Sequence, residues 1–508
     1  MSAAPAAANQ SPPHPPAVPI LVLQVVAGFF IALKFGLMFA VAPVGDEAYY
    51  FLWGQHPDWS YFDHPPLNAW ILGATSRLFG WTRFGLRVPT LVALAGTIWL
   101  FHLWARRVAP DNRRGYFWLA VAVYLASPGI FSFTSIVFPD YLLLFLLTLS
   151  GYWFAGYLAD FDGGKTPGAA WLYLAAIALG LATLAKYNAA LFGLGIAVLI
   201  VLHPRYRGLL RNPHLYLAAL VAIGVQAPVV YWNLSHGAAS FAYHFSGRWG
   251  GIDFGDIELN WLPLALASWL HFLFLAPLVA AFAMIGRGRG SVSEFAQASR
   301  RLALATLGTS TLVTVGFSLF ERVLSYWNIA AFPMIYPLVP AFIRSRWIVA
   351  VHFVFGPGLA VALAINYALM PVALFWGQRD WESSIMHGWD QVAAEAAVLR
   401  EQYRPDFLAS TRYSLAAQFA FALQEPSAVT DLAGRPSQFD YWSDPGIRRG
   451  ANALILDVEG FELGDRAAQF DRVELLREIE VTRFGYHVTR FRLYLGYGYR
   501  GGKGVAPR

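Results

Sequence analysis

Gly45-Asp46-Glu47-Ala48-Tyr49-Tyr50 is a short polar segment that follows an apolar run over residues 19–42. The run is long enough to cross a bilayer as one helix. Acidic side chains are costly near hydrocarbon, and those that occur there usually serve a function. The two carboxylates at the outlet of the first predicted span therefore mark a candidate functional region.

The composition is that of a polytopic membrane protein. Of the 508 residues, 57% are apolar and only 13% are charged, whereas soluble domains have roughly 25% charged residues. The chain contains 19 Trp and 24 Tyr, the residues that collect at membrane–water interfaces. It contains no cysteine, which excludes disulfides, thiolate zinc sites and thiol catalysis. The net charge of +6 forms no compact basic patch, so no nucleic-acid partner is expected.

Apolar runs predict an α-helical multi-pass membrane protein with about eleven spans, within a range of about 10 to 13. The runs cover residues 19–42, 84–105, 115–133, 140–158, 170–185, 187–202, 215–231, 261–285, 302–320, 327–342 and 348–372.

The charges of the loops predict the orientation of these spans. Lys and Arg gather in the loops on one side, whereas most acids lie in loops 43–83 and 232–260 on the other. The basic loops are 106–114, 203–214, 286–301 and 343–347. By the positive-inside rule the basic side is cytoplasmic. The acidic loops then lie outside.

Three regions follow from these patterns. Residues 1–18, rich in Ala and Pro, predict a disordered tail before a retained first helix. Residues 19–372 form the membrane domain, with the large outer loop 43–83. Residues 373–508 have a higher charge density and predict a soluble α/β domain, with strands near 406–410, 451–458 and 474–495 and a helix over 413–423. Because the N-terminus is predicted to be cytoplasmic and the number of spans is odd, this domain is expected outside, in the periplasm.

Four acids at the outer side are candidates for chemistry. Asp46 and Glu47 could act as a general base or bind a divalent cation, or they could merely solvate a helix end. Asp63-His64-Pro65-Pro66 adds an acid and a potential cation to the same loop. Asp140 stands at the mouth of another span, where it is either functional or a plain helix cap.

Basic and polar groups complete the candidate set. Lys186, in an apolar setting, suits a phosphate or carboxylate partner or simply snorkels to the interface. Asn233 and Arg248 belong to a second outer loop that offers donors for sugar or phosphate. The spacing of the histidines in these loops matches no standard metal site.

Taken in order, these motifs resemble a known family. Five segments are similar to motifs of the GT-C glycosyltransferases of the protein-mannosyltransferase-like family. They are Gly45–Tyr50, Tyr61-Phe-Asp-His-Pro-Pro-Leu67, Phe138-Pro-Asp140, Gly180-Leu-Ala-Thr-Leu-Ala-Lys186-Tyr187 and Tyr326-Trp-Asn328. This family includes bacterial enzymes that decorate lipid A with aminoarabinose or galacturonic acid. The resemblance covers residues 20–345 and extends weakly to Gln438-Phe-Asp-Tyr-Trp442.

The resemblance implies a GT-C fold and assigns roles to residues. Asp46 would be the catalytic base and Asp140 a second catalytic acid lining the cavity, while Lys186 and His64 would face the donor phosphate. The remaining residues implied in substrate binding are Glu47, Tyr49, Asp63, Tyr187, Asn233, Arg248 and Asn328. No metal ligand is assigned, and assistance by a divalent cation is left open. His64 stands where aminoarabinose transferases carry a lysine, which argues against aminoarabinose as the sugar.

The implied reaction transfers a sugar, with inversion, from a polyprenyl-phosphate donor to a glycolipid acceptor such as lipid A. It would occur at the periplasmic face of the bacterial inner membrane, among membrane lipids. The alternative is a transporter or flippase of a lipid-linked saccharide. Transporters tend to carry ionisable groups near the bilayer midplane within repeated halves, whereas here the acids gather at one face and no repeat is evident.

Overall fold

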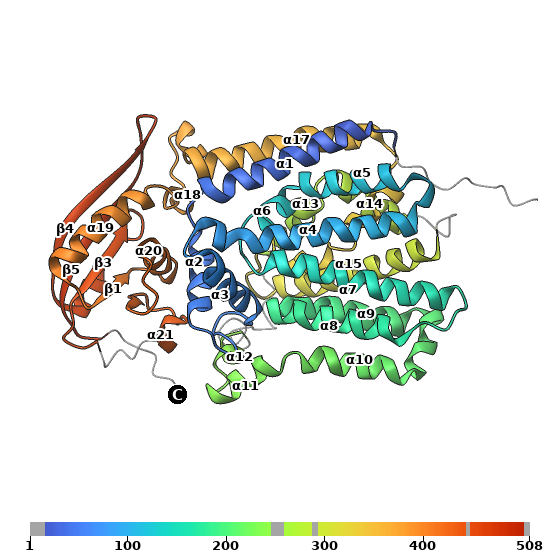
Figure 1. The fold of residues 1–508 in the computed structure, drawn as a ribbon, viewed down its shortest axis with the longest axis horizontal. Helices are drawn as coiled ribbons and strands as arrows, with labels where there is room; N and C mark the ends of the chain where they lie inside the picture. Colours follow the sequence, from blue (N-terminus) through green and yellow to red (C-terminus); the bar gives the residue numbers. More distant parts are fainter. Residues whose placement is uncertain (1–15, 245–258, 287–292, 443–447, 502–508) are drawn as a thin grey trace, which may run out of the picture.

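The computed structural model describes residues 16–244, 259–286, 293–442 and 448–501. Long helices lie side by side in a bundle, and a small domain that contains a β-sheet covers one end of it (Figure 1). We call this end of the bundle the domain end. The predicted tail 1–18 falls almost wholly outside the described residues.

The bundle confirms a helical multi-pass membrane protein. Four helices are long and apolar enough to span a bilayer, and three bent helix pairs raise this number to seven in the described part of the chain. The four are α1 (Ile20–Ala40), α4 (Arg83–Val108), α7 (Asp140–Asp162) and α17 (Arg346–Ala364), the last continued by a turn to Leu369. Other helices account for further predicted runs: α5 (Arg113–Ala126), α6 (Pro128–Phe133), α8 (Ala169–Ala185), α9 (Ala190–Leu202) and α15 (Glu294–Ser318).

Three predicted spans are not single straight helices. The run 327–342 is a series of short turns that ends in α16 (Val339–Phe342), and nearly all of it is buried. Pro333, Pro337 and Pro340 interrupt it, and each removes a helical hydrogen bond. The run 261–285 divides into α13 (Leu262–Phe272) and α14 (Ala276–Gly286), which meet at 102°. The run 215–231 corresponds to α10 (Pro213–Gly224) and α11 (Ala227–Ser235), bent by 45°.

The predicted outer loop 43–83 folds as two helices at the domain end, α2 (Gly45–Gln55) and α3 (Leu67–Phe79). They cross at Gly54 and Gly73, where a Cβ atom on Gly54 would lie 2.5 Å from the backbone nitrogen of Gly73. Glycine is therefore required for this crossing. The crossing fixes α2, which carries Asp46, on α3, and α3 in turn packs against α4 of the bundle.

The C-terminal domain has the predicted α/β character. Its five-stranded sheet has the order β2-β1-β3-β5-β4. The strands β1 (Phe407–Ser410), β2 (Val429–Asp431) and β3 (Ala453–Val458) are parallel, and β4 (Phe470–Arg483) and β5 (Tyr486–Tyr499) form an antiparallel hairpin. The helices α18 (Trp381–Ser384), α19 (Trp389–Tyr403) and α20 (Tyr413–Leu423) accompany the sheet. β1 and β3 are buried throughout, which explains their continuous apolar runs.

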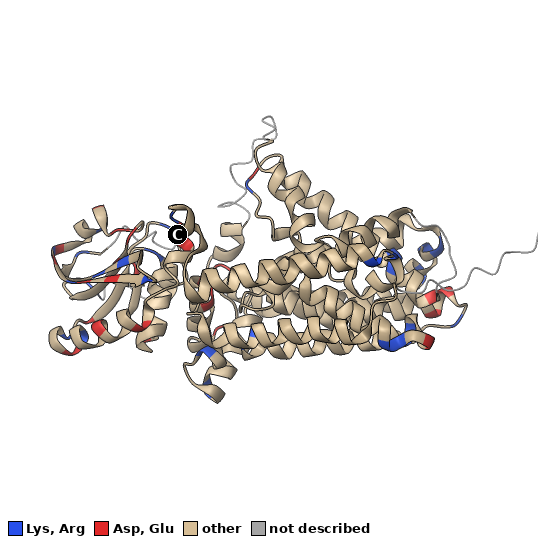
Figure 2. Ribbon diagram, turned by 90° about the horizontal axis from the view of Figure 1, so that it is seen from above, with Lys and Arg blue, Asp and Glu red and all other residues tan. Residues whose placement is uncertain are grey.

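Charge is distributed unequally along the bundle. Figure 2 shows Lys and Arg gathered at the end farthest from the sheet. There Asp162 forms ion pairs with Arg205, at 2.6 Å, and with Arg301. We call this end the basic end.

Candidate active site

Asp46 lies in the first turn of α2, between the bundle and the C-terminal domain. The preceding Gly45 packs against α20, since a Cβ atom there would lie 2.5 Å from the Cβ of Ser414. This contact brings the next residue of the chain close to α20. The Tyr413 hydroxyl donates a hydrogen bond of 2.9 Å to Asp46 Oδ1. Asp46 is partly exposed as a residue, whereas its neighbours Gly45 and Glu47 are buried.

The surroundings of Asp46 make it a stronger base. Burial raises the pKa of its carboxyl above the ordinary value, while the Tyr413 hydrogen bond and the charge of Arg435 partly oppose that rise. A general base works best when its pKa approaches the working pH. Among the described residues, Tyr413 is the one hydrogen-bond partner of this carboxylate, which leaves acceptor capacity for a substrate hydroxyl.

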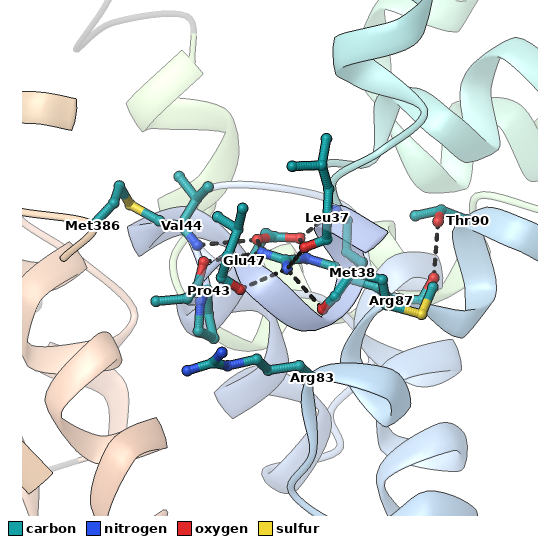
Figure 3. A network of polar contacts seen from close by, with 12 residues as sticks. Leu37, Met38, Pro43, Val44, Glu47, Arg83, Arg87, Thr90 and Met386 are labelled. Atoms are coloured by element: carbon teal, nitrogen blue, oxygen red, sulfur yellow. Dashed lines mark hydrogen bonds and ion pairs between the residues drawn. The ribbon is translucent and has the colours of Figure 1, made fainter. Parts of the chain in front are cut away.

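Glu47, the neighbouring acid, is fully occupied inside the protein (Figure 3). Arg87 of α4 binds both carboxylate oxygens, with distances of 2.9 Å from Nε and 2.6 Å from Nη2. The backbone N–H groups of Val44 and Val137 donate to the same carboxylate at 3.0 and 2.9 Å. Glu47 is 0% exposed. The Glu47 carboxylate therefore holds together the start of α2, α4 and the backbone at Val137. The substrate contact that the family resemblance implies for Glu47 would require these hydrogen bonds to break.

Arg87 was not among the predicted site residues, although it organises this part of the molecule. Its guanidinium also donates to the backbone oxygens of Val41, at 2.8 Å, and Ala42, at 3.0 Å, just beyond α1. A cation is favoured there by the negative end of the helix dipole. The sequence contained one signal: an arginine at the outer end of a predicted span, opposite to the positive-inside bias.

Asp63 joins the first outer loop to the C-terminal domain. It accepts a hydrogen bond of 2.8 Å from the Tyr49 hydroxyl, and Arg435 lies 3.1 Å from its other oxygen. Arg435 also donates to the Tyr243 hydroxyl at 2.6 Å, and its guanidinium lies 4.8 Å from the centre of the Tyr413 ring. Burial raises the pKa of Tyr49 well above the ordinary value, so its hydroxyl stays a donor.

Asp140 and Lys186 form a second polar centre. Asp140 begins α7, Lys186 ends α8, and the ammonium lies 2.7 and 2.9 Å from the two carboxylate oxygens. The Lys186 ammonium also lies 4.8 Å from the centre of the Tyr326 ring. The sequence predicted either a phosphate or a carboxylate as the partner of Lys186, and the structure shows the carboxylate of Asp140.

Aromatic rings connect the two polar centres. Tyr50 follows Asp46 by one turn of α2, and its ring lies 6.1 Å from that of Phe138. The Phe133 ring lies 6.2 Å from Phe138 and 5.1 Å from Tyr326, whose ring covers Lys186. The ring of His64 lies 5.7 Å from Tyr50 and 6.4 Å from His244. Tyr187 lies 5.2 Å from His244, ring to ring. The predicted residues Asp46, Asp63, His64, Asp140, Lys186 and Tyr187 thus border one region at the domain end.

Two predicted polar residues lie inside the scaffold. Asn233 donates to the Val229 carbonyl at 2.9 Å and accepts from the Phe241 backbone at 3.0 Å. Asn328 bonds to Ser310, at 2.8 Å, and to Thr311, at 3.1 Å. Both asparagines are buried, so each holds neighbouring backbone or helices in place. Arg248 lies outside the described residues, as do the acids at 253, 256 and 258.

The motif Gln438-Phe439-Asp440-Tyr441-Trp442 docks the C-terminal domain on the first outer loop. The Gln438 side chain accepts a hydrogen bond of 2.7 Å from the Phe62 backbone N–H. Tyr441 stacks on Phe62 at 5.6 Å, and Trp442 stacks on His56 at 4.4 Å. These contacts bring Arg435 and Tyr413 over α2. Part of the candidate site therefore belongs to the soluble domain.

No group of three His, Asp or Glu side chains suited to a metal ion occurs in the described part of the chain. Glu47, which was considered for a divalent cation together with Asp46, binds Arg87, and Asp140 binds Lys186.

Comparisons with known proteins find similarity to glycosyltransferases. A family model described as dolichyl-phosphate-mannose-protein mannosyltransferase matches residues 63–232. The chain is 25% identical to lipid A galacturonosyltransferase RgtD of Rhizobium johnstonii over 402 residues, which cover 75% of this chain and 78% of the relative. It is 29% identical to undecaprenyl phosphate-alpha-4-amino-4-deoxy-L-arabinose arabinosyl transferase 2 of Pseudomonas fluorescens over 232 residues, which cover 43% of this chain and 38% of that protein.

A solved structure shares the whole fold. ArnT from Cupriavidus metallidurans, bound to undecaprenyl phosphate, superposes with a TM-score of 0.60 at 16% identity. The match covers 94% of this chain and 98% of that one. The likeness therefore includes the helical bundle and the C-terminal domain together.

Proposed function

Because the chain is a membrane glycosyltransferase of the GT-C type in the protein-mannosyltransferase-like family, we propose that it transfers a sugar from a polyprenyl-phosphate donor to a lipid A-like glycolipid. The relatives support both substrates. One is named for transfer to lipid A, and another for an undecaprenyl-phosphate sugar. The solved homologue holds undecaprenyl phosphate.

One observation about the acids supports Asp46 as the catalytic base. Glu47, Asp63 and Asp140 are each bound to a cation, namely Arg87, Arg435 and Lys186 respectively. Asp46 instead accepts a hydrogen bond from a neutral phenol and is partly exposed. A base needs both a free lone pair and access to the substrate proton.

The proposed reaction is a single inverting displacement. Asp46 takes the proton of an acceptor hydroxyl as its oxygen attacks the anomeric carbon of the donor. The bond between that carbon and the phosphate oxygen breaks, and the polyprenyl phosphate departs with the electron pair. Because the leaving group is already an anion, cations serve it better than a general acid would.

Lys186 and His64 are the proposed partners of that phosphate. Two N–H groups of the Lys186 ammonium bind Asp140, and an ammonium has three donors. The third is available for a phosphate oxygen, while Asp140 holds the ammonium in place. His64 borders the same region through the Tyr50 ring.

The membrane orientation is part of the proposal. The Arg-rich end of the bundle would face the cytoplasm by the positive-inside rule, with the domain end and Asp46 at the periplasmic face of the inner membrane. The long apolar helices offer the lipid surface along which a polyprenyl chain would lie.

The decisive experiment is transfer by the purified full-length protein in lipid vesicles. Polyprenyl-phosphate donors carrying galacturonic acid or aminoarabinose are offered with a lipid A acceptor. The variants are Asp46→Asn and Asp111→Asn, the latter an exposed acid in the loop between α4 and α5. Transfer by wild type and Asp111→Asn, but not by Asp46→Asn, is expected. No transfer with any donor, together with movement of labelled donor across the bilayer, would favour the flippase alternative.

A further inference from the structure

The tip of the β4–β5 hairpin has an unusual residue in its turn. Arg483 pairs with Tyr486, so Phe484 and Gly485 form a two-residue loop. Both have positive φ, 52° and 82°. Turns of this kind favour Asn, Asp or Gly at the first position, and a bulky side chain with positive φ is rare. The hairpin therefore places an aromatic residue where its own backbone disfavours one.

Packing within the protein does not explain this choice. Phe484 is 72% exposed. On the facing segment, which follows α17, Trp376 is also 72% exposed and Phe375 56%. The rings of Phe375 and Tyr486 lie 6.3 Å apart. Ring contacts thus join Phe375, Trp376 and Tyr486 from two segments distant in the sequence, and Phe484 is exposed in the turn that precedes Tyr486. We call these four residues the aromatic tip.

The position of the aromatic tip indicates what covers it. The candidate span that begins at Arg346 ends at Leu369, only a few residues before Phe375. Figure 1 shows the free end of the hairpin beside the segment that follows α17. Trp and Tyr collect at the level of the lipid headgroups, and the aromatic tip contains one of each, Trp376 and Tyr486. Arg483 precedes Phe484 in sequence and suits the anionic headgroups, whereas Arg379, which follows Trp376, pairs with Glu459.

We propose that the aromatic tip inserts into the interfacial layer of the bilayer at the domain end. The C-terminal domain is then held at two places, by the Gln438–Trp442 motif on the outer loop and by the tip in the lipid. Two anchors fix the tilt of the domain, and with it the positions of Tyr413 and Arg435 near Asp46. The occupant is the lipid itself; a second copy of the chain is the alternative that the test excludes.

The absence of cysteine from the chain allows a direct test. A spin label is attached to Phe484→Cys in the full-length protein in lipid vesicles, with Arg472→Cys, at the exposed far end of β4, as control. Collision rates are measured with oxygen, which concentrates in lipid, and with a water-soluble nickel complex. High oxygen and low nickel rates at position 484, with the reverse at 472, are expected. High nickel rates at 484 would overturn the proposal, and so would low rates with both reagents, since these indicate protein packing.

A second variant separates anchoring from folding. Phe484→Asn supplies a residue that the turn prefers, so the Tm in detergent should equal or exceed that of wild type. A label at Tyr486→Cys should become more accessible to nickel in the Phe484→Asn background. A fall in Tm would show that the phenylalanine supports the fold, and unchanged nickel access at 486 would show that it does not hold the tip in lipid.

Discussion

The Tyr413 hydroxyl lies 2.9 Å from Asp46 Oδ1, although 367 positions separate the two residues. One belongs to the C-terminal domain and the other to the first outer loop of the membrane domain. The candidate base is therefore held by a residue from outside the bundle. The C-terminal domain is thus a structural part of the candidate site.

Tyr413→Phe should move the acidic limb of the pH–rate profile to higher pH. The phenol hydrogen bond lowers the pKa of Asp46 against the effect of burial, so its removal raises that pKa further. A base must be ionised, and at a given acidic pH a smaller fraction of the variant is ionised. The profile of kcat/KM against pH measures the shift. Tyr403→Phe, at the exposed end of α19, should match wild type, and an unshifted Tyr413→Phe profile would disconnect the phenol from the base.

The Asp140–Lys186 pair should show strong coupling in a double-mutant cycle. Asp140→Asn or Lys186→Met alone leaves a buried charge without its partner, a change that typically costs about 3–5 kcal/mol. The double variant removes both charges, so its loss of stability should be well below the sum of the single losses. Thermal or denaturant unfolding in detergent measures the stability. Additive losses would mean that the ion pair is not formed.

Glu47→Gln and Arg87→Lys should act on folding before they act on catalysis. Arg87 binds both oxygens of Glu47 and the carbonyls beyond α1, a fork that lysine does not reproduce. We expect destabilisation of roughly 2–5 kcal/mol, with donor KM in the folded fraction close to wild type. Asp46→Asn should show the opposite pattern, a stable but inactive protein. A stable Glu47→Gln enzyme with a raised KM would instead place Glu47 in substrate binding.

Local signals in the sequence predicted the membrane class, the α/β domain and the region of the site. Hydropathy found the long helices, a polar segment after the first apolar run marked Asp46, and a lone acid in apolar surroundings marked Asp140. The run 327–342 failed as a span because hydropathy does not register its three prolines, which turn a buried apolar segment into short turns.

Residues whose role depends on distant partners could not be predicted in this way. Arg87 lies 40 positions from Glu47, and Arg435 lies 372 positions from Asp63. Arg435 stands in no distinctive local pattern, and the one local signal of Arg87, its place at the end of a predicted span, does not identify Glu47 as its partner. Glu47 illustrates the converse: its position beside Asp46 suggested a shared function, but successive residues on a helix point in different directions. One carboxylate faces the C-terminal domain and the other faces Arg87.

The most direct test of the account is the rate of sugar transfer by Asp46→Asn in vesicles that contain the donor and lipid A. The substitution keeps the size of the side chain and removes the base, so the rate should fall by roughly 10²–10⁴-fold while the Tm stays near that of wild type. A variant that transfers sugar at the wild-type rate would contradict the assignment of Asp46 as the catalytic base.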